Sequence, residues 1–529
     1  MAALRGADRR RLRPGARLLS DDGQPYPRNV DETTPKAVVA DGVELPIAED
    51  SVAAQDNIGK KIVGGGAWRI VAYAFATLIA VFAISIISRE VGPVDFAQFT
   101  TSLSLIAIAI QISDFGLLSL GVREYAALSA DTRERTFRAL ITLRVMTSTL
   151  AAVGIVVFGI VMNYPQELVI GLAFAGGAVV IGAMQTSFTV PLQATYRLNL
   201  MAMLDATRQL LMSSSMITAA LLTGSVGVII ATNLPVSIVM AVLAGCLVFR
   251  QVSILPSWDL KTMRSLIGDV GAFAVASSVG LMYAYFSQIV SDAVLSGHES
   301  GQFALAFRVY AVLLAGWVIA VSGAFPLLVT SSRDDIQRMI FATRRLIQTS
   351  VVVGAACTVG LVTGADFVVD VLGGAEFEEA AQLIAIVALG LPATFTVVTG
   401  STVLLASGRH RELVAVSIAG AAVSIIFTWI ASSLWDGVGA ALGLTVGEVV
   451  IALSYLWLVW RIDRSALPGL LWLLGVVVAA LAGCAIALTG LPALAAAIAG
   501  GAIFLVVGLV LRIFPPELTD RIPGHPKSA

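Results

Sequence analysis

The sequence predicts an all-α polytopic membrane protein, and three observations support this fold class. Of the 529 residues, 57% are hydrophobic and only 13% are charged, with a mean hydropathy of +0.88, whereas soluble domains carry about 25% charged residues. About 14 apolar stretches follow one another from residue 63 onward, each near the length of roughly 20 residues that spans a bilayer as a helix. The gaps between them alternate between basic and non-basic, as loops on opposite sides of a membrane do.

The predicted transmembrane helices are separated by short polar gaps or by glycine and proline. They cover residues 64–87, 97–121, 139–162, 168–191, 199–222, 226–249, 267–290, 302–326, 346–364, 379–405, 413–434, 438–460, 467–488 and 492–512. The fifth opens with the charged segment RLNLMAMLDATR, and the ninth has poorly defined ends. The polar residues 1–60 predict a disordered cytoplasmic tail, either a solvated extension or a docking segment for partners.

The positions of lysine and arginine predict the orientation in the membrane. The even-numbered gaps contain Arg123, Arg133, Arg135, Arg138, Arg197, Arg250, Lys261, Arg264, Arg333, Arg338, Arg344, Arg345, Arg409, Arg411, Arg461 and Arg464. Among the odd-numbered gaps, the first contains Arg89 and the others contain no lysine or arginine. Because cytoplasmic loops are enriched in these residues, we expect a multi-pass protein of the cytoplasmic (inner) membrane with both termini in the cytoplasm.

Three pairs of segments match in the same order along the chain, which indicates an internal duplication. DFAQF at 95–99 aligns with ESGQF at 299–303, FGLLSLGVRE at 115–124 with FPLLVTSSRD at 325–334, and LQATYR at 192–197 with LLASGR at 404–409. The offset drifts only slowly, and each pair lies on the same predicted side of the membrane. The repeat unit is six spans, so both copies enter the membrane in the same direction.

The duplication predicts two six-helix lobes that face each other across a central cavity. Transporters built from repeats commonly bind substrate at such an interface. The predicted parts are the tail 1–60, an N-lobe 61–250 (spans 1–6), a C-lobe 251–460 (spans 7–12), spans 13 and 14 within 461–512, and a cytoplasmic C-terminal tail 513–529. The last two spans are apolar and outside the duplication, so we expect them to face lipid.

Ionisable residues inside the spans are the candidate binding residues, because a charge at membrane depth is costly and usually faces a cavity or a partner. The candidates for a substrate-binding cavity are Arg308, Arg89, Asp114, Arg69, Arg144, Arg208 and Glu448. Some of them have a structural alternative. Asp205 and Arg208 share one helix face and can neutralise each other. Arg69, Arg144 and Asp269 lie near inner ends, from which long side chains reach head groups, and Arg89 has Glu90 beside it.

Arg308 and Glu448 are the strongest candidates for facing a cavity. Arg308 lies about a turn and a half into the predicted span 8, on the outer half of a chain that otherwise keeps basic residues on the inner side. Glu448 lies near the middle of span 12, too deep to reach a head group easily. Arginine suits phosphate because its planar fork donates two parallel hydrogen bonds and stays charged in a low dielectric. At the position of Arg308, the first repeat has Ser104.

Other classes of protein are disfavoured by what the sequence contains. The three cysteines lie in apolar runs with no zinc spacing, and the three histidines are scattered, so we expect neither a metal site nor a cofactor. The sequence has no Walker-type loop of an ATP-driven pump, and the outward loops are too short for an extracytoplasmic catalytic domain. The net charge of −1 argues against a nucleic-acid partner. The sequence thus predicts a protein that is not an enzyme.

Several segments resemble the Wzx-type polysaccharide exporters, which belong to the multidrug/oligosaccharidyl-lipid/polysaccharide exporter superfamily. They are ISREVGPVDFAQFTTSLSLIAIAIQISDFGLLSLGVREYA at 86–126, LQATYRLNLMAMLDATRQ at 192–209 and DAVLSGHESGQFALAFRVY at 292–310. The residues that match the family pattern are Arg89, Gly92, Pro93, Phe99, Asp114, Gly116, Arg123, Glu124, Gly301, Phe303 and Arg308. The family's usual glycine before the aromatic residue is absent, since Gln98 precedes Phe99. The resemblance covers about residues 60–460.

This resemblance implies a flippase that moves a polyprenyl-pyrophosphate-linked saccharide to the outer leaflet by alternating access, for cell-surface polysaccharide biosynthesis. The expected partners are a lipid-linked oligosaccharide, the lipid bilayer and the glycosyltransferase or polymerase machinery. A lipid II flippase for peptidoglycan, a drug/cation antiporter and a membrane scaffold without transport activity are the alternatives. The surplus of intramembrane arginine over acidic residues favours an anionic cargo, with Arg308 as the contact to its phosphate.

Overall fold

The computed structural model describes residues 50–127, 130–194, 197–249, 257–325, 328–329 and 336–514. The predicted N-terminal tail and most of the predicted C-terminal tail lie outside these residues. The chain divides into two units, Met1–Gly64 and Gly65–Ala529. In the described residues of the second unit the secondary structure is entirely helical, which confirms the predicted fold class.

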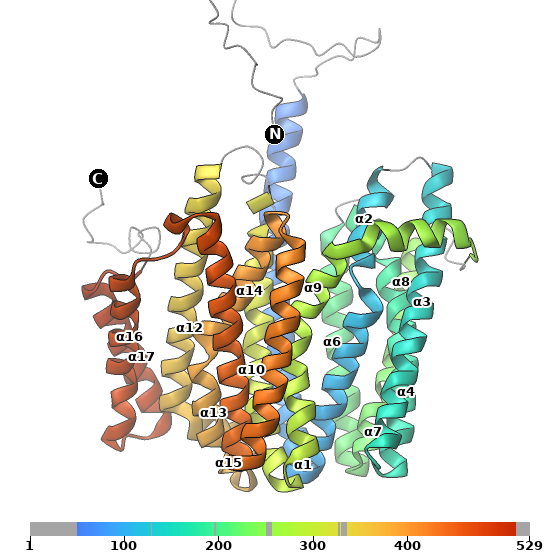
Figure 1. Cartoon of the computed structure of the whole chain (residues 1–529). Coiled ribbons are helices and arrows are strands. Elements are labelled where there is room, and N and C mark those ends of the chain that lie inside the picture. The colour runs from blue at the N-terminus through green and yellow to red at the C-terminus, as the bar shows by residue number, and fades with distance from the viewer. Residues whose placement is uncertain are drawn as a thin grey trace, which may run out of the picture. The chain divides into compact units, whose positions relative to one another are not determined.

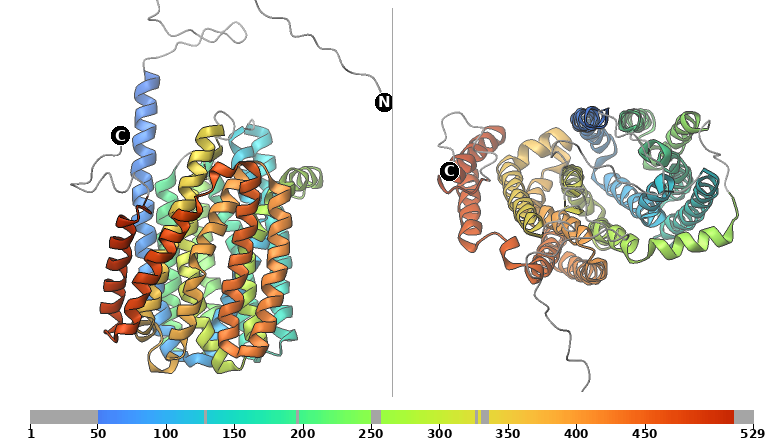
Figure 2. Two further views of the ribbon diagram at one scale, coloured as in Figure 1. Left: turned by 60° about the vertical axis from the view of Figure 1, so that its left-hand side comes forward. Right: turned by 90° about the horizontal axis from the view of Figure 1, so that it is seen from above.

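The helices of this second unit run side by side, with α2 to α8 on one side, α10 to α15 next to them and α16 and α17 at the far edge (Figures 1 and 2). Their bounds are α1 Asp50–Asp114, α2 Leu117–Ala127, α3 Ala130–Val161, α4 Gln166–Phe188, α5 Val190–Ala194, α6 Leu198–Thr223, α7 Val226–Ala231, α8 Asn233–Val248, α9 Leu260–Val294, α10 Gly297–Ser322, α12 Ile336–Leu372, α13 Ala380–Leu389, α14 Leu391–Ala406, α15 His410–Ile462, α16 Leu470–Cys484 and α17 Ala493–Val510. Short 3-10 helices are η1 Ala375–Phe377, η2 Arg464–Ala466 and η3 Ala485–Thr489. Each of the fourteen predicted spans falls on one or two of these helices.

Nine helices in the described part of the chain are long and apolar enough to cross a membrane, and α13 with α14, bent by 45°, would make a tenth. Two of the nine, α1 and α15, each contain two predicted spans joined across a kink. In α1 the kink is at Gly92, whose φ of 72° is open only to glycine at low cost. In α15 it is at Trp435 and Asp436. With α6 and α9, which carry two further predicted spans, the structure is consistent with fourteen crossings.

The two halves of α15 form a tightly packed hairpin. A Cβ atom on Gly439 would lie 1.8 Å from the carbonyl oxygen of Ala431, and one on Gly443 would lie 2.5 Å from the Cα of Thr428. Glycine therefore lets the two backbones approach closely, as small residues do between helices in membranes. This hairpin carries spans 11 and 12 and positions Glu448 in the interior.

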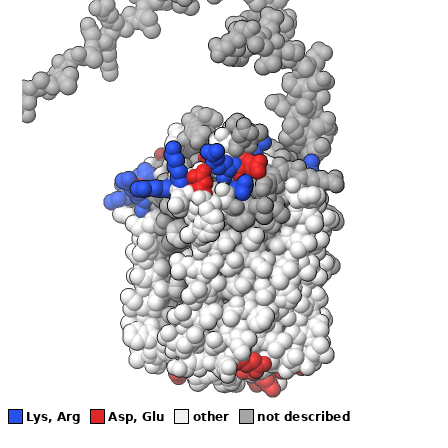
Figure 3. Space-filling model, turned by 90° about the vertical axis from the view of Figure 1, so that its right-hand side faces the viewer, with Lys and Arg blue, Asp and Glu red and all other residues white. Residues whose placement is uncertain are grey.

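The two ends of the helix bundle differ in charge. We call the end at which α3, α6, α9, α12 and α15 begin the basic end, and the end at which α4, α7, α10 and α13 begin the acidic end. In Figure 3 lysine and arginine gather at the first, with some aspartate and glutamate among them, whereas the second shows aspartate and glutamate, and an uncharged surface lies between. This uncharged band is the surface expected of a protein that crosses a membrane, and the chain is a multi-pass membrane protein.

Buried apolar residues of the two predicted lobes form one large shared cluster, and smaller clusters lie toward the basic end. One large cluster includes Leu172 and Ile229 of the N-lobe together with Phe303 and Phe377 of the C-lobe. Toward the basic end, one cluster lies within the N-lobe and the first turns of α9, and another lies within the C-lobe. The two predicted lobes therefore share apolar contacts toward the acidic end.

Candidate functional site

The N-lobe contains a polar cavity of about 190 Å³. Its lining comes from α1, α2, α3, α4, α6 and α8. The polar and charged lining residues are Gln111, Ser113, Asp114, Arg144, Thr186, Arg208, Asn233 and Ser237. Two arginines and one aspartate give this lining a formal charge of +1, and the amides and hydroxyls around them are the groups that bind sugar hydroxyls or phosphate oxygens.

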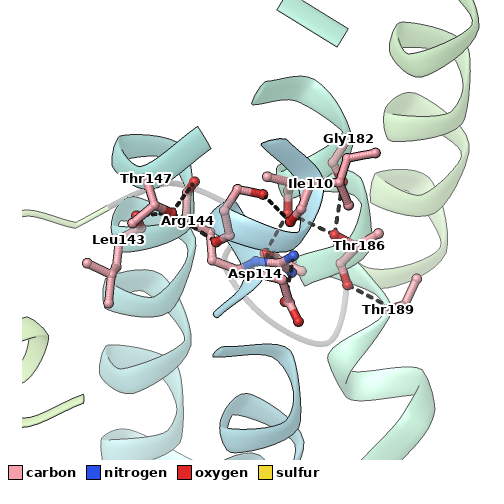
Figure 4. Close-up of polar contacts among 11 residues, drawn as sticks. Ile110, Asp114, Leu143, Arg144, Thr147, Gly182, Thr186 and Thr189 are labelled. Atoms are coloured by element: carbon pink, nitrogen blue, oxygen red, sulfur yellow. Dashed lines mark hydrogen bonds and ion pairs between the residues drawn. The ribbon is translucent and has the colours of Figure 1, made fainter. Parts of the chain in front are cut away.

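A helix break positions Asp114 in this cavity. Helix α1 ends at Asp114, and Phe115 and Gly116 follow with positive φ of 39° and 72° before α2 begins. The carbonyl oxygen of Ser113, freed by the break, accepts a hydrogen bond of 2.9 Å from Thr147 Oγ1 of α3. This bond ties α3 to the end of α1 and brings Asp114 opposite Arg144 (Figure 4).

Arg144 is the buried partner of Asp114. Its Nη2 lies 3.0 Å from Asp114 Oδ1, and only 4% of its side chain is exposed, compared with 29% for Asp114. Its Nη1 also donates to Ser187 Oγ at 3.2 Å. The structure therefore brings two of the predicted residues together as an ion pair, in place of an arginine that reaches the head groups.

Arg208 also lines the cavity, on α6. Asp205, one turn earlier on the same helix, attracts its guanidinium electrostatically, which was the structural alternative for this pair. Asp205 is itself an exposed residue and is not part of the cavity lining. Arg208 thus keeps a guanidinium at the cavity wall while its counter-charge lies outside.

Arg308 lies near the middle of helix α10. This helix begins at Gly297, capped by Ser296, whose side chain accepts from the backbone of Glu299. Arg308 is eleven residues further on, about 16 Å along the helix, and the predicted turn and a half counts from residue 302, where the apolar run begins. Its Nε and Nη2 are buried and have no hydrogen-bond partner in the described part of the chain. The nearest aromatic face is that of Phe99, 5.7 Å from its guanidinium carbon.

Glu448 is enclosed in the C-lobe core and is 0% exposed. Its Oε2 accepts a hydrogen bond of 2.7 Å from the hydroxyl of Tyr283, and its Oε1 accepts one from the hydroxyl of Tyr310. In the part of the chain that the structure describes, no basic side chain forms an ion pair with it. The carboxyl group thus joins α9, α10 and α15 inside the lobe and lies apart from the N-lobe cavity.

Arg89 and Arg69 are the two remaining candidates. Arg89 is exposed at the acidic end and donates from Nη2 to the carbonyl oxygens of Asp370 and Val371. It thereby caps the last turn of α12, where a cation is favoured by the helix dipole. The side chain of Arg69 lies outside the described residues.

Sequence reasoning missed the partners that surround these charges. Tyr283 and Tyr310 hold Glu448, and Asn233 lines the N-lobe cavity. The tyrosines carry no signal in the sequence, because a tyrosine in an apolar span is ordinary. Asn233, however, is a lone amide within an apolar run, and this pattern could have indicated a residue that lines a cavity. In the described residues no group of three His, Cys, Asp or Glu side chains lies close enough to hold a metal ion.

Comparison with solved structures shows what the fold resembles. A structure of the lipid II flippase MurJ in an inward closed conformation has a TM-score of 0.66 and 14% identity, covering 84% of this chain and 98% of that one. An inward-facing multidrug resistance MATE family transporter of the MOP superfamily has a TM-score of 0.57 and 15% identity, covering 76% and 98%. The MATE transporter VcmN of Vibrio cholerae has 0.51 and 13%, covering 76% and 98%. At such identities the likeness concerns the fold.

The sequence itself identifies the family. The family described as polysaccharide biosynthesis protein matches residues 86–382, which is more than half of the chain. No curated protein matches significantly. The matched region runs from the end of span 1 to α13 and includes the N-lobe cavity and Arg308. The chain is therefore a member of the polysaccharide biosynthesis protein family, built on the fold of the MOP-superfamily flippases and transporters.

Proposed function

We propose that the protein is a flippase that moves a polyprenyl-pyrophosphate-linked saccharide across the cytoplasmic membrane for cell-surface polysaccharide biosynthesis. The observation that carries this proposal is the N-lobe cavity, which is lined by Arg144, Arg208 and a single carboxylate, Asp114, among amides and hydroxyls. A cavity at membrane depth with an excess of guanidinium groups offers charge-assisted hydrogen bonds to a pyrophosphate. The polar remainder of its lining suits the first sugar.

The cavity volume supports transport by alternating access. About 190 Å³ equals the share of roughly six water molecules in the liquid, and ligand pockets usually measure about 300–1,000 Å³. A pyrophosphate or one sugar fits, and a whole oligosaccharide does not. The cargo would therefore need the lobes to separate further at the basic end, where the first turns of α9 pack on the N-lobe and a different cluster lies in the rest of the C-lobe.

The charge difference between the two ends supports the orientation. The basic end would face the cytoplasm under the positive-inside rule, which places both termini there in the inner membrane. The N-lobe cavity lies in the half of the bundle nearer the basic end, so it would receive cargo from the cytoplasmic leaflet. Glycosyltransferases that build the saccharide act before this step, and the polymerase machinery after it.

A lipid II flippase for peptidoglycan is the second candidate. It is favoured by the similarity to the MurJ structure, at a TM-score of 0.66. Lipid II also joins a polyprenyl chain to sugar through pyrophosphate, so the same arginines would suit both cargoes. A drug/cation antiporter is disfavoured, because the excess of guanidinium groups in the cavity repels cations.

The proposal is tested by flipping in proteoliposomes. The full chain is reconstituted with a fluorescent undecaprenyl-pyrophosphate disaccharide, and dithionite quenching reports the fraction that reaches the outer leaflet. Wild type should flip this lipid, and Arg208→Gln should lower the rate at least tenfold. Arg411→Gln, which removes an exposed arginine at the basic end, is the matched control and should flip normally. Flipping of lipid II alone would establish the second candidate, and no flipping of either lipid would overturn both.

A further inference from the structure

A second cavity lies on the Gly65–Ala529 unit, and it differs in character from the first. It is a groove of about 390 Å³ between α1 before its kink, α10 and α12. Apart from Arg308 its lining is apolar, with Val81 of α1, Leu313 of α10 and Leu361 of α12 as examples. Phe367 at its edge is 40% exposed, so the groove is open to the surrounding lipid. An apolar groove of this kind accommodates a hydrocarbon chain.

Arg308 places one positive charge in this apolar groove. The residue is half-buried, and its Nε and Nη2 are buried without a hydrogen-bond partner among the described residues, which costs free energy because these donors have lost water without gaining an acceptor. Phe99 provides a weak cation–π contact at 5.7 Å, which compensates only in part. The groove thus combines an unsatisfied cation with a surface for an alkyl chain, and the ligand that satisfies both is a lipid phosphate.

The depth of Arg308 decides which lipid phosphate it can bind. The hydrocarbon core is about 30 Å thick, so the phosphates of ordinary phospholipids lie roughly 15 Å from its middle. Arg308 is the twelfth of the 26 residues of α10, which runs from the acidic end toward the basic end, so it lies near the middle of this helix. A bulk phospholipid would have to pull its head group into the core to reach it. A lipid in passage between the leaflets brings its phosphate to this depth.

We propose that this groove binds the lipid carrier of the cargo, with the first isoprenoid units against α1, α10 and α12 and the carrier phosphate on Arg308. This inference rests on the proposed function and adds the part of the carrier that is recognised. The two cavities would then bind different parts of the cargo. The N-lobe cavity would hold the saccharide head, and the groove would hold the isoprenoid chain and the carrier phosphate. The groove lies nearer the acidic end, so it would be occupied late in the passage.

The groove offers a substitution that fills it without a clash. Gly360 of α12 lines the groove, and a Cβ atom added there would meet nothing within 4 Å. Gly360→Phe should therefore fold and occupy the space of the isoprenoid chain. Gly501 of α17 has equally open surroundings but is not part of the groove lining, so Gly501→Phe is the matched control.

Binding of undecaprenyl phosphate to the purified full chain in nanodiscs, measured by native mass spectrometry, tests the proposal. Wild type and Gly501→Phe should bind one equivalent, and Gly360→Phe and Arg308→Gln should each weaken binding at least tenfold. Undecaprenol lacks the phosphate. Its affinity for wild type should therefore be no higher than the affinity of undecaprenyl phosphate for Arg308→Gln. Wild-type affinity in Gly360→Phe would overturn the proposal, as would equal displacement by phosphatidylglycerol, which would indicate a site for bulk lipid.

The same preparation separates this inference from the proposed function. If undecaprenyl phosphate binds in the groove but wild type flips neither saccharide lipid, the site stands and the proposed function fails. If wild type flips the lipid and Gly360→Phe flips it at the same rate, the flippase stands and the groove is not on its path.

Discussion

Arg144 and Arg308 are two arginines inside the helix bundle, and their surroundings differ: Arg144 is buried, whereas Arg308 is half-buried. Arg144 has Asp114 at 3.0 Å and Ser187 at 3.2 Å, in a cavity rich in polar groups. Arg308 has two buried nitrogens without a partner among the described residues and lies in an apolar groove. A paired arginine stabilises the folded chain and still lends charge to a cavity. An unpaired one stabilises nothing by itself, and its charge is compensated only when an anion binds.

Removing a charge should change the stability of the folded protein in opposite directions at the two sites. The largest change is expected at the Asp114–Arg144 pair. Asp114→Ala leaves Arg144 buried without its counter-ion. Removing one partner of a buried pair costs about 3–5 kcal/mol, and since Asp114 remains 29% exposed we expect about 3 kcal/mol. The loss of stability is measured by denaturant unfolding of the purified protein in detergent.

The double variant Asp114→Ala with Arg144→Leu is the control for this prediction. It removes both charges, so most of the stability should return, because an apolar replacement of a buried pair is often neutral. A double variant as unstable as Asp114→Ala would show that the helix break at Phe115 and Gly116, and not the ion pair, depends on Asp114.

The two arginines also show which features could be predicted from the sequence and which could not. The spans, their alternating gaps and the presence of charges inside them follow from hydropathy and composition. The Asp114–Arg144 pair does not, because it depends on a backbone break at Phe115 and Gly116 that turns the end of α1 toward α3. The full length of α10 does not follow from hydropathy either, because the polar cap at Ser296 begins the helix before the apolar run starts.

The second prediction converts the unpaired arginine into a paired one. Val312 lies one turn after Arg308 on α10 and lines the same groove, so Val312→Glu places a carboxylate at the i, i+4 spacing that allows an ion pair. The carboxylate would occupy the guanidinium and repel phosphate. We expect binding of undecaprenyl phosphate to weaken by about a hundredfold, or about 2.7 kcal/mol.

Val312→Gln is the matched neutral variant for this test. It has the same size and hydrogen-bonding reach without the charge, so it should lose tenfold or less of the affinity. Equal losses in the two variants would attribute the effect to bulk in the groove, and Arg308 would then not be the group that recognises phosphate.

The third prediction concerns stability at the unpaired site. Arg308→Gln removes a half-buried charge that has no counter-ion among the described residues, so the variant should be more stable than wild type in detergent without lipid, by about 1 kcal/mol. Added undecaprenyl phosphate should raise the stability of wild type and leave that of the variant unchanged. A destabilised variant would mean that Arg308 is held by the protein itself, as Arg144 is.

The smallest expected effect is at a hydrogen bond that joins the two predicted lobes at the acidic end and involves neither arginine. The hydroxyl of Tyr164, in the turn between α3 and α4, donates to Asp292 Oδ2 of α9 at 2.6 Å. Burial, and then Asp292, raise the pKa of Tyr164 above its ordinary value. The hydroxyl is therefore protonated below pH 10, the unfolded value, and its contribution would be lost only as the pH rises through the higher folded pKa.

Tyr164→Phe removes this bond and should weaken closure of the acidic end by about 1 kcal/mol. Spin labels at Asn163 and His298, which are exposed on the two lobes, report the separation by pulsed electron paramagnetic resonance. At pH 7 a larger fraction of the variant molecules should show a long distance between the two labels. Wild type should show this increase only above pH 10. Opening of this end should make the Arg308 region accessible to polar reagents while the Asp114–Arg144 pair, nearer the basic end, keeps its protection. If the distances in Tyr164→Phe match those of wild type, the shared apolar core alone holds the lobes together.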